Sequence, residues 1–164
     1  MMNDLHTPQI LLFSEQEEPQ SYEIYVYGTD DLVEQHKDSF CLALCRYLDE
    51  IHISQKTLAR LTGIAPSTLS RYLSGKRKMQ YDCLCAVCIA LRLHPCRQRY
   101  LFSLLMYALP CYQDFRKADK NIIMAYLDGC AFNNRYTLTA CNEQLKAIHV
   151  KPLTHLTSAK GDSV

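Results

Sequence analysis

The stretch ISQKTLARLTGIAPSTLSRYLSGKRKMQY, residues 53–81, decides how the central part of this chain folds. Its apolar positions and its internal glycine have the spacing of two short helices joined by a tight turn. The stretch contains no acidic residue, and this charge pattern favours contact with the phosphates of DNA. Its six basic residues are Lys56, Arg60, Arg71, Lys76, Arg77 and Lys78.

The first of the two helices is bounded by residues that suit helix ends. Ser54 is a good N-cap, because its short side chain can accept a hydrogen bond from an N–H group of the first turn. Gly63 is placed to stop the helix in a left-handed conformation, which glycine adopts without a steric cost. The positions predicted to face inward are Leu58, Ala59 and Leu61.

The second helix is predicted to begin at Pro66 and to run to about Leu73. Ile64 precedes it as an apolar residue that can pack between the two helices. Leu69 and Leu73 are expected to be buried, together with part of Tyr72. The helix should end at Ser74 and Gly75.

A pair of helices of this kind can present its second helix to the major groove while the first crosses the DNA backbone. Short polar side chains early in the second helix allow it to approach the bases closely. Ser67 and Thr68 have this character, and Arg71, one turn further on, can reach guanine or a phosphate. These three are the predicted base-reading residues. The predicted backbone contacts come from Gln55, Lys56, Lys76, Arg77 and Lys78.

At this point the sequence resembles a known family, the lambda repressor/Cro helix-turn-helix domain of the xenobiotic-response-element type. The resemblance covers residues 38–96 and includes the run from Tyr81 to Pro95, which is similar to the family's fourth helix and its exit. The matching residues are Gln55, Leu58, Ala59, Gly63, Ile64, Ser67, Thr68, Leu69, Leu73, Gly75 and Lys76.

The resemblance implies an all-α, five-helix DNA-binding domain. It also implies that Gln55, which opens the first helix of the pair, contacts the DNA backbone, and that polar residues early in the second helix read bases. One departure is Ala65-Pro66, which replaces a more usual polar pair and weakens direct readout from the leading tip. The residues with a structural role in the motif are Ala59, Gly63, Ile64, Leu69 and Leu73.

Two other functions fit the same motif. Helix-turn-helix units also serve in antitoxin-like regulators and in adaptors that bind proteins, and a basic run is often only a solvated face. Weighed against these, the match at many positions favours a sequence-specific, double-stranded-DNA-binding transcriptional regulator of repressor type. By analogy with such regulators we expect a homodimer acting on an inverted repeat.

Charge is segregated along the 164 residues, although the formal net charge is only +1. Residues 1–50 hold eleven acidic and two basic residues, a net of −9, whereas residues 51–113 hold nine basic residues and one acidic residue, a net of +8. The acidic N-terminus is either a solubilising tail or a segment that covers the basic face. It is also a possible binding site for a protein partner.

We expect four parts: an irregular acidic segment at 1–30 with a β-prone run at 22–27, a DNA-binding domain at 31–110, a helical packing or dimerisation module at 111–150, and a flexible tail at 151–164. Outside the central pair, helices are expected at about 31–52, 96–109 (ended by Pro110), 113–130 (closed by Gly129) and 137–148.

The sequence indicates neither a catalytic site nor a membrane-spanning segment. The chain has no P-loop, HExxH or GxSxG motif, its six histidines are scattered, and its longest apolar run is interrupted by Pro110. Nine cysteines with no secretory signal predict reduced thiols in the cytoplasm, where Cys41, Cys45, Cys85 and Cys88 lie at helical spacing as small buried residues. We therefore expect a non-enzymatic protein with no metal site and no cofactor.

Overall fold

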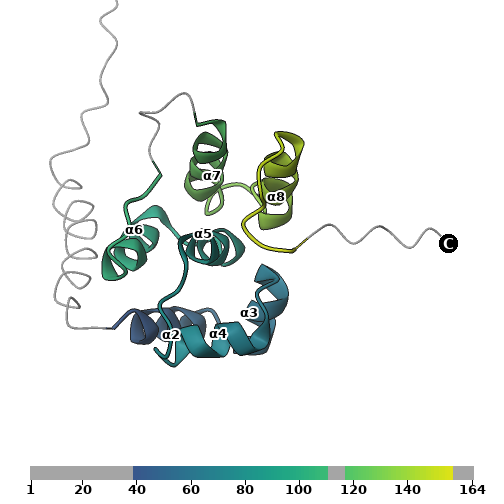
Figure 1. The fold of residues 1–164 in the computed structure, drawn as a ribbon. Helices are drawn as coiled ribbons and strands as arrows, with labels where there is room; N and C mark the ends of the chain where they lie inside the picture. Colours follow the sequence, from purple (N-terminus) through teal and green to yellow (C-terminus); the bar gives the residue numbers. More distant parts are fainter. Residues whose placement is uncertain (1–38, 111–116, 157–164) are drawn as a thin grey trace, which may run out of the picture. The chain divides into compact units, whose positions relative to one another are not determined.

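The computed structural model describes residues 39–110 and 117–156. These residues form seven α-helices and no strand, which confirms the all-α prediction for the described part of the chain. Figure 1 shows the helices in chain order. They are α2 (Phe40–Glu50), α3 (Gln55–Thr62), α4 (Pro66–Leu73), α5 (Tyr81–Ala90), α6 (Pro95–Leu104), α7 (Ala118–Gly129) and α8 (Leu138–Ala147).

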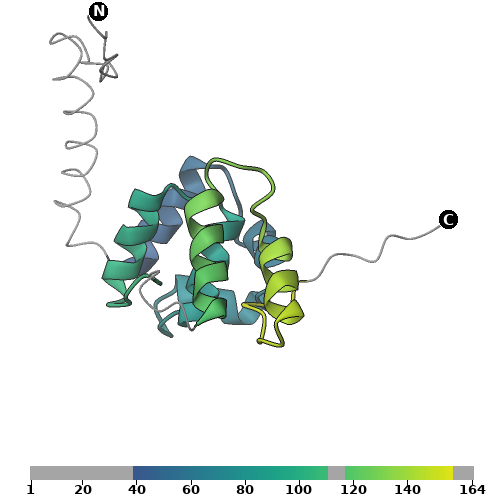
Figure 2. The same ribbon diagram turned by 90° about the horizontal axis from the view of Figure 1, so that it is seen from above.

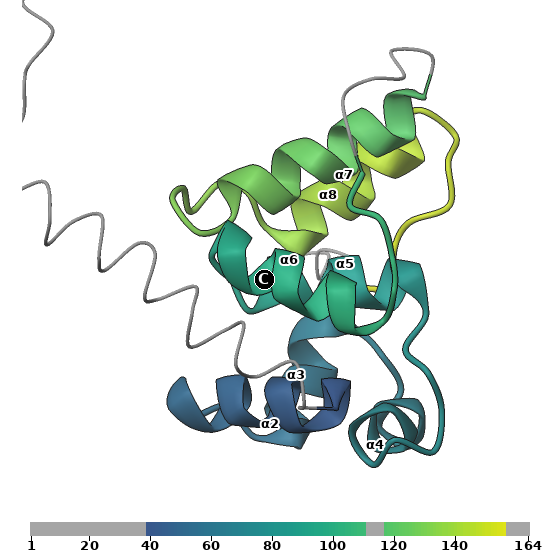
Figure 3. The same ribbon diagram turned by 90° about the vertical axis from the view of Figure 1, so that its left-hand side faces the viewer.

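The helices lie in three tiers (Figure 3). The lowest tier holds α2, α3 and α4, the middle tier α5 and α6, and the upper tier α7 and α8. Helix α5 packs against α3 on one side and against α7 and α8 on the other. Six consecutive α5 residues, Leu84 to Ile89, are therefore buried, as expected of a helix covered all round. Helices α2 to α6 correspond to the five helices that the resemblance predicts.

Helix α2 starts later than expected. The predicted helix over 31–52 is wrong at its start, because Ser39 has an extended backbone and its hydroxyl accepts a hydrogen bond from Leu42 N–H at 3.4 Å. The helix therefore begins at Phe40 and buries Phe40, Leu44 and Leu48 on one stripe, as the sequence predicted. The predictions for residues 1–38, including the strand at 22–27 and the acidic segment, lie outside the described residues.

Helix α6 ends five residues before the predicted end at 109. Leu105 is its C-cap, and Met106 then adopts a left-handed φ of +57°. Tyr107 N–H donates to Phe102 C=O and Met106 N–H donates to Ser103 C=O, which is the Schellman arrangement. The prediction that Pro110 ends this helix is therefore wrong.

Helices α7 and α8 form a hairpin above the middle tier. Figure 2 shows α7 lying between α6 and α8, and α7 contacts both. Thr137 caps α8, because its hydroxyl accepts a hydrogen bond from Ala140 N–H at 3.2 Å. The pair contacts α5, and α7 also contacts α6. Its role as a packing or dimerisation module stays a prediction.

The tail predicted to begin at residue 151 is ordered as far as Leu156. Leu153 and Thr154 are buried, with 6% and 8% of their surfaces exposed. In Figure 1 this last described stretch passes between α8 and α3. The composition of residues 151–156 suggested a frayed end, but contacts with distant helices hold them in place.

Buried thiols make up part of the core. Cys85 and Cys88 are fully buried in α5, as predicted, whereas Cys41 and Cys45 are only half-buried. Burial raises the pKa of the Cys88 thiol well above its ordinary value, so the thiol is neutral and a poor nucleophile. Among the described residues, no three His, Cys, Asp or Glu side chains gather as metal ligands.

Candidate nucleic-acid interface

The first helix of the motif, α3, starts as predicted. Ser54 is extended, and its hydroxyl accepts from Thr57 N–H at 3.1 Å. This cap leaves Gln55 and Lys56 on the first turn, and both side chains are exposed. Leu58 and Ala59 are buried against the domain, so the predicted inward face is confirmed apart from Leu61, which is half-buried.

The turn between α3 and α4 depends on three successive residues. Thr62 is fully buried, and its hydroxyl donates a hydrogen bond to Leu58 C=O at 2.8 Å. The same hydroxyl accepts a hydrogen bond from Ile64 N–H at 3.3 Å. Gly63 has φ +69°, the left-handed value that the sequence predicted. Ile64 is buried between the helices. The turn is therefore fixed by backbone conformation, a buried hydroxyl and an apolar contact.

Gly63 meets a second requirement that the sequence did not reveal. A Cβ atom at this position would lie 2.8 Å from the backbone nitrogen of Leu156. The C-terminal stretch thus approaches the turn so closely that no side chain fits there. Neither composition nor periodicity around Leu156 could signal this contact, because it joins residues 93 positions apart.

Helix α4 carries the predicted base-reading residues. Pro66 occupies the first turn, and Ala65 precedes it with no side-chain cap. Ser67 and Arg71 are exposed, and Thr68 is half-buried. The opposite face buries Leu69 and Tyr72, which are 0% and 1% exposed.

One assignment on this helix is reversed. Tyr72 is the fully buried residue, whereas Leu73 is half-buried. The Tyr72 hydroxyl donates toward the Cys83 sulfur at 3.8 Å, so even its polar end faces the interior. Burial raises the pKa of Tyr72 above its ordinary value.

The basic loop after α4 is held in a defined shape. Gly75 has φ +73°, and Arg77 N–H donates to Arg71 C=O at 3.1 Å. Met79 is fully buried, and its carbonyl accepts from the Tyr107 hydroxyl at 3.0 Å. Lys76, Arg77 and Lys78 are all exposed on this loop.

The three cations of the loop differ in their surroundings. The Lys78 ammonium lies 4.4 Å from the centroid of the Tyr107 ring, and the Arg77 guanidinium lies 6.0 Å from that of Tyr72. These cation–π contacts orient both side chains. The sequence predicts a helix through Tyr107 and gives no sign of its contact with Lys78.

One further basic residue of the region is paired. Arg97 donates to Glu50 at 2.7 Å and its guanidinium lies over the Tyr47 ring at 4.6 Å. That pair ties α6 to α2. Exposed basic side chains remain on α3, on α4 and on the loop after it, and also at Arg92 and Arg99, so the surface of these helices carries positive charge. Such a surface attracts a polyanion through summed charge.

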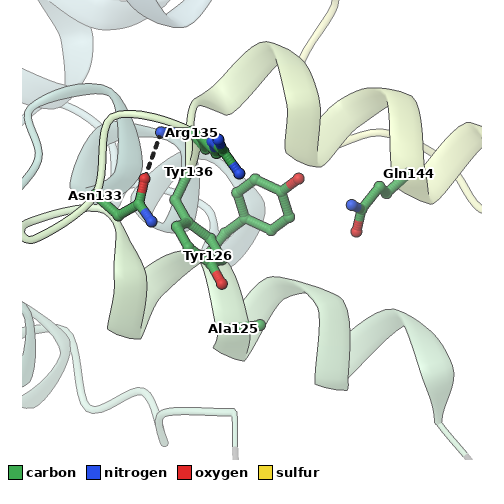
Figure 4. Close-up of a pocket in the computed structure, with 6 residues that line it drawn as sticks. All are labelled: Ala125, Tyr126, Asn133, Arg135, Tyr136 and Gln144. Atoms are coloured by element: carbon green, nitrogen blue, oxygen red, sulfur yellow. Dashed lines mark hydrogen bonds between the residues drawn. The ribbon is translucent and has the colours of Figure 1, made fainter.

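A pocket of about 390 Å³ lies in the upper tier. Figure 4 shows the residues that line it. Arg135 N–H donates to the Asn133 side-chain oxygen at 2.9 Å at its edge, and Tyr126 and Tyr136 line it. Asn133, Arg135 and Gln144 are exposed, so the pocket is an open depression. Its lining has no carboxylate or thiol that could act as an acid, base or nucleophile.

Residues 46–95 match the family described as Helix-turn-helix. The match covers α3, α4 and α5 completely and confirms the lambda repressor/Cro-like resemblance for this segment. No curated protein and no solved structure matches the chain. The match indicates a DNA-binding helix-turn-helix regulator. No helix within the described ranges is long and apolar enough to cross a membrane.

Proposed function

We propose that this protein is a sequence-specific, double-stranded-DNA-binding transcriptional regulator of repressor type, whose α4 enters the major groove. The observation that carries the proposal is the exposed polar face of α4, flanked by cations at the start of α3 and on the loop after α4. A helix held this way can bring Ser67, Thr68 and Arg71 to base edges.

Phosphate contacts are assigned to the flanking residues. Gln55 and Lys56 lie at the start of α3, and Lys76, Arg77 and Lys78 lie on the loop held by Tyr107. Four of these residues are cations. If each neutralises one phosphate, the logarithm of the association constant should fall with the logarithm of salt concentration with a slope of about −3.6.

The proposal is tested with duplexes selected from a random pool. Arg71→Ala should cost about 1–3 kcal/mol, concentrated at one base position, because a bidentate contact to a base is lost. Lys76→Ala should weaken binding to all sequences alike, since a phosphate contact carries no sequence information. Fluorescence anisotropy across single-base variants of the site separates the two effects.

Lys120→Ala, an exposed lysine of α7, is the matched control and should leave affinity unchanged. A parent protein that retains no duplex at low ionic strength would contradict the proposal and favour a protein-binding adaptor. A sequence-selective effect of Lys76→Ala would contradict that residue's role.

We further propose a homodimer that places two α4 helices about 34 Å apart, one turn of DNA. Sedimentation of the protein with a full inverted repeat and with one half-site tests this. Two protomers on the full site and a sharp loss of affinity for the half-site are expected. Binding as a monomer to both duplexes would contradict the dimer.

A further inference from the structure

The last described stretch of the chain, residues 151–156, is held by one buried side chain. Asn142 of α8 is 0% exposed. Its side-chain oxygen accepts from Leu153 N–H at 3.0 Å, and its amide donates to Leu156 C=O at 3.0 Å and to the Thr154 hydroxyl at 3.4 Å. A buried amide with all these partners fixes the path of the segment.

That path runs beside the leading end of α4. Leu156 lies against Gly63 in the motif turn. A depression of about 370 Å³ is lined by Lys151, His155 and the residues between them, together with Ala65 and Thr68. Thr68 is one of the proposed base-reading residues, so residues 151–155 border the same end of α4.

The segment KPLTHL has no acidic residue. Leu153 and Thr154 are buried, whereas Lys151 and His155 are exposed. Burial raises the pKa of the Cys83 thiol, and the Lys151 ammonium opposes this shift. Cys83 and Lys151 line the same depression, so Lys151 lies close to the first turn of α5. Pro66, Ser67 and Thr68, the first residues of α4, carry no charge of their own.

From this placement we infer that residues 151–156 are part of the DNA interface, and that Lys151 contacts a phosphate beside the groove entered by α4. Asn142 is a positioning residue, because it holds the segment and does not itself contact DNA. The inference rests on the proposed function. It assigns to the C-terminal stretch the cation that the Ala65-Pro66 end of α4 lacks.

The test uses the full chain and the selected duplex, with anisotropy measured over a series of KCl concentrations. Lys151→Gln should reduce affinity about three- to tenfold at low salt and make the salt slope shallower by about one. Lys146→Gln is the control. Lys146 is an exposed lysine in the last turn of α8 and does not line the depression, so it loses the same charge nearby.

Asn142→Ala provides a second test. Freed from its clamp, the segment should lose its position, so affinity falls by a similar factor, and Lys151→Gln should then add little. Both substitutions are checked by circular dichroism melting. Lys151→Gln alone decides the question if Asn142→Ala does not fold, because Lys151 is exposed.

Equal affinities and slopes for Lys151→Gln and Lys146→Gln would overturn the inference, as would tighter binding by Lys151→Gln. The proposed function fails separately. If the parent binds DNA and Arg71→Ala weakens it while Lys151→Gln does not, only the present inference is wrong. A parent that binds no duplex would end both.

Discussion

Gly129 ends α7 with a helical backbone, and its role is steric. A Cβ at this position would lie 2.7 Å from two ring carbons of Tyr136. The Tyr136 ring packs edge-on against Tyr126, with centroids 5.2 Å apart, so it has little room to move. The glycine thus permits close packing of the connector on α7, and it does not act as a left-handed cap.

Gly129→Ala should therefore lower the free energy of unfolding by about 1–3 kcal/mol, because overpacking outweighs the gain in helix propensity. Urea denaturation measures the change. In a Tyr136→Ala background the same substitution should be neutral or stabilising, since the ring is gone. If Gly129→Ala stabilised the parent protein as well, the Tyr136 ring would be able to move aside at little energetic cost.

Among the residues that the structure describes, four that are not glycine have left-handed backbones. They follow the ends of α2, α5, α6 and α8, and each closes a Schellman arrangement. A left-handed φ costs a residue with a Cβ about 1 kcal/mol, so tertiary packing around these ends has to hold them. The residues are His52, Arg92, Met106 and His149.

At the scale of elements, the loop after α4 depends on a residue of the segment that follows α6. Tyr107 contributes its hydroxyl to Met79 C=O, its ring to Lys78, and an edge-on contact to Tyr81. A short basic loop without such an anchor would sample many conformations. The anchor therefore orders cations that are proposed to meet phosphates, which reduces the entropy lost on binding.

Tyr107→Phe isolates the hydrogen bond, since the ring and its contacts remain. It should cost about 1 kcal/mol of stability and speed hydrogen exchange in residues 76–80. DNA affinity should also fall modestly, because the loop is less ordered. Tyr136→Phe, which changes a tyrosine of the upper tier, should leave exchange in this loop as it was; a similar acceleration there would point to a global effect.

At the scale of the whole molecule, thiols form part of the apolar interior. Cys85, Cys88, Cys130 and Cys141 are buried, and burial raises the pKa of each. The pKa is raised to about 11 for Cys130 and to about 12 for Cys141. A thiol of the unfolded chain ionises near pH 8.5.

Above about pH 8.5 the unfolded chain therefore binds fewer protons than the folded one, and stability should fall as pH rises. In that window each such thiol lowers the free energy of unfolding by up to about 1.4 kcal/mol per pH unit. Below that window it causes no such decrease. Urea midpoints at about pH 7 and about pH 9.5 measure the fall.

Cys88→Ala removes one titrating group, so it should show a smaller decrease between the two pH values, although it is less stable at both. A variant with the same pH dependence as the parent would show that Cys88 is not held neutral by the fold.

Much of the motif was predictable from local rules. Ser54, Gly63 and Pro66 occupy the N-cap, turn and first-turn positions that suit these residue types. The helical spacing of apolar residues predicted α3, α4 and the burial of Leu58 and Leu69. These features depend on steric and hydrogen-bonding preferences within a few residues. A sequence displays such preferences directly.

Other features were decided only by tertiary packing. The early end of α6, after which Tyr107 bonds to Met79, the burial of Tyr72 in place of Leu73, and the ordered path of residues 151–156 each involve contacts between distant parts of the chain. The types of residue that make those contacts do not mark them as contact sites in the sequence. Their partners, such as Gly63 for Leu156, become neighbours only when the three tiers assemble, because burial and close approach are properties of the packed fold and not of the local sequence.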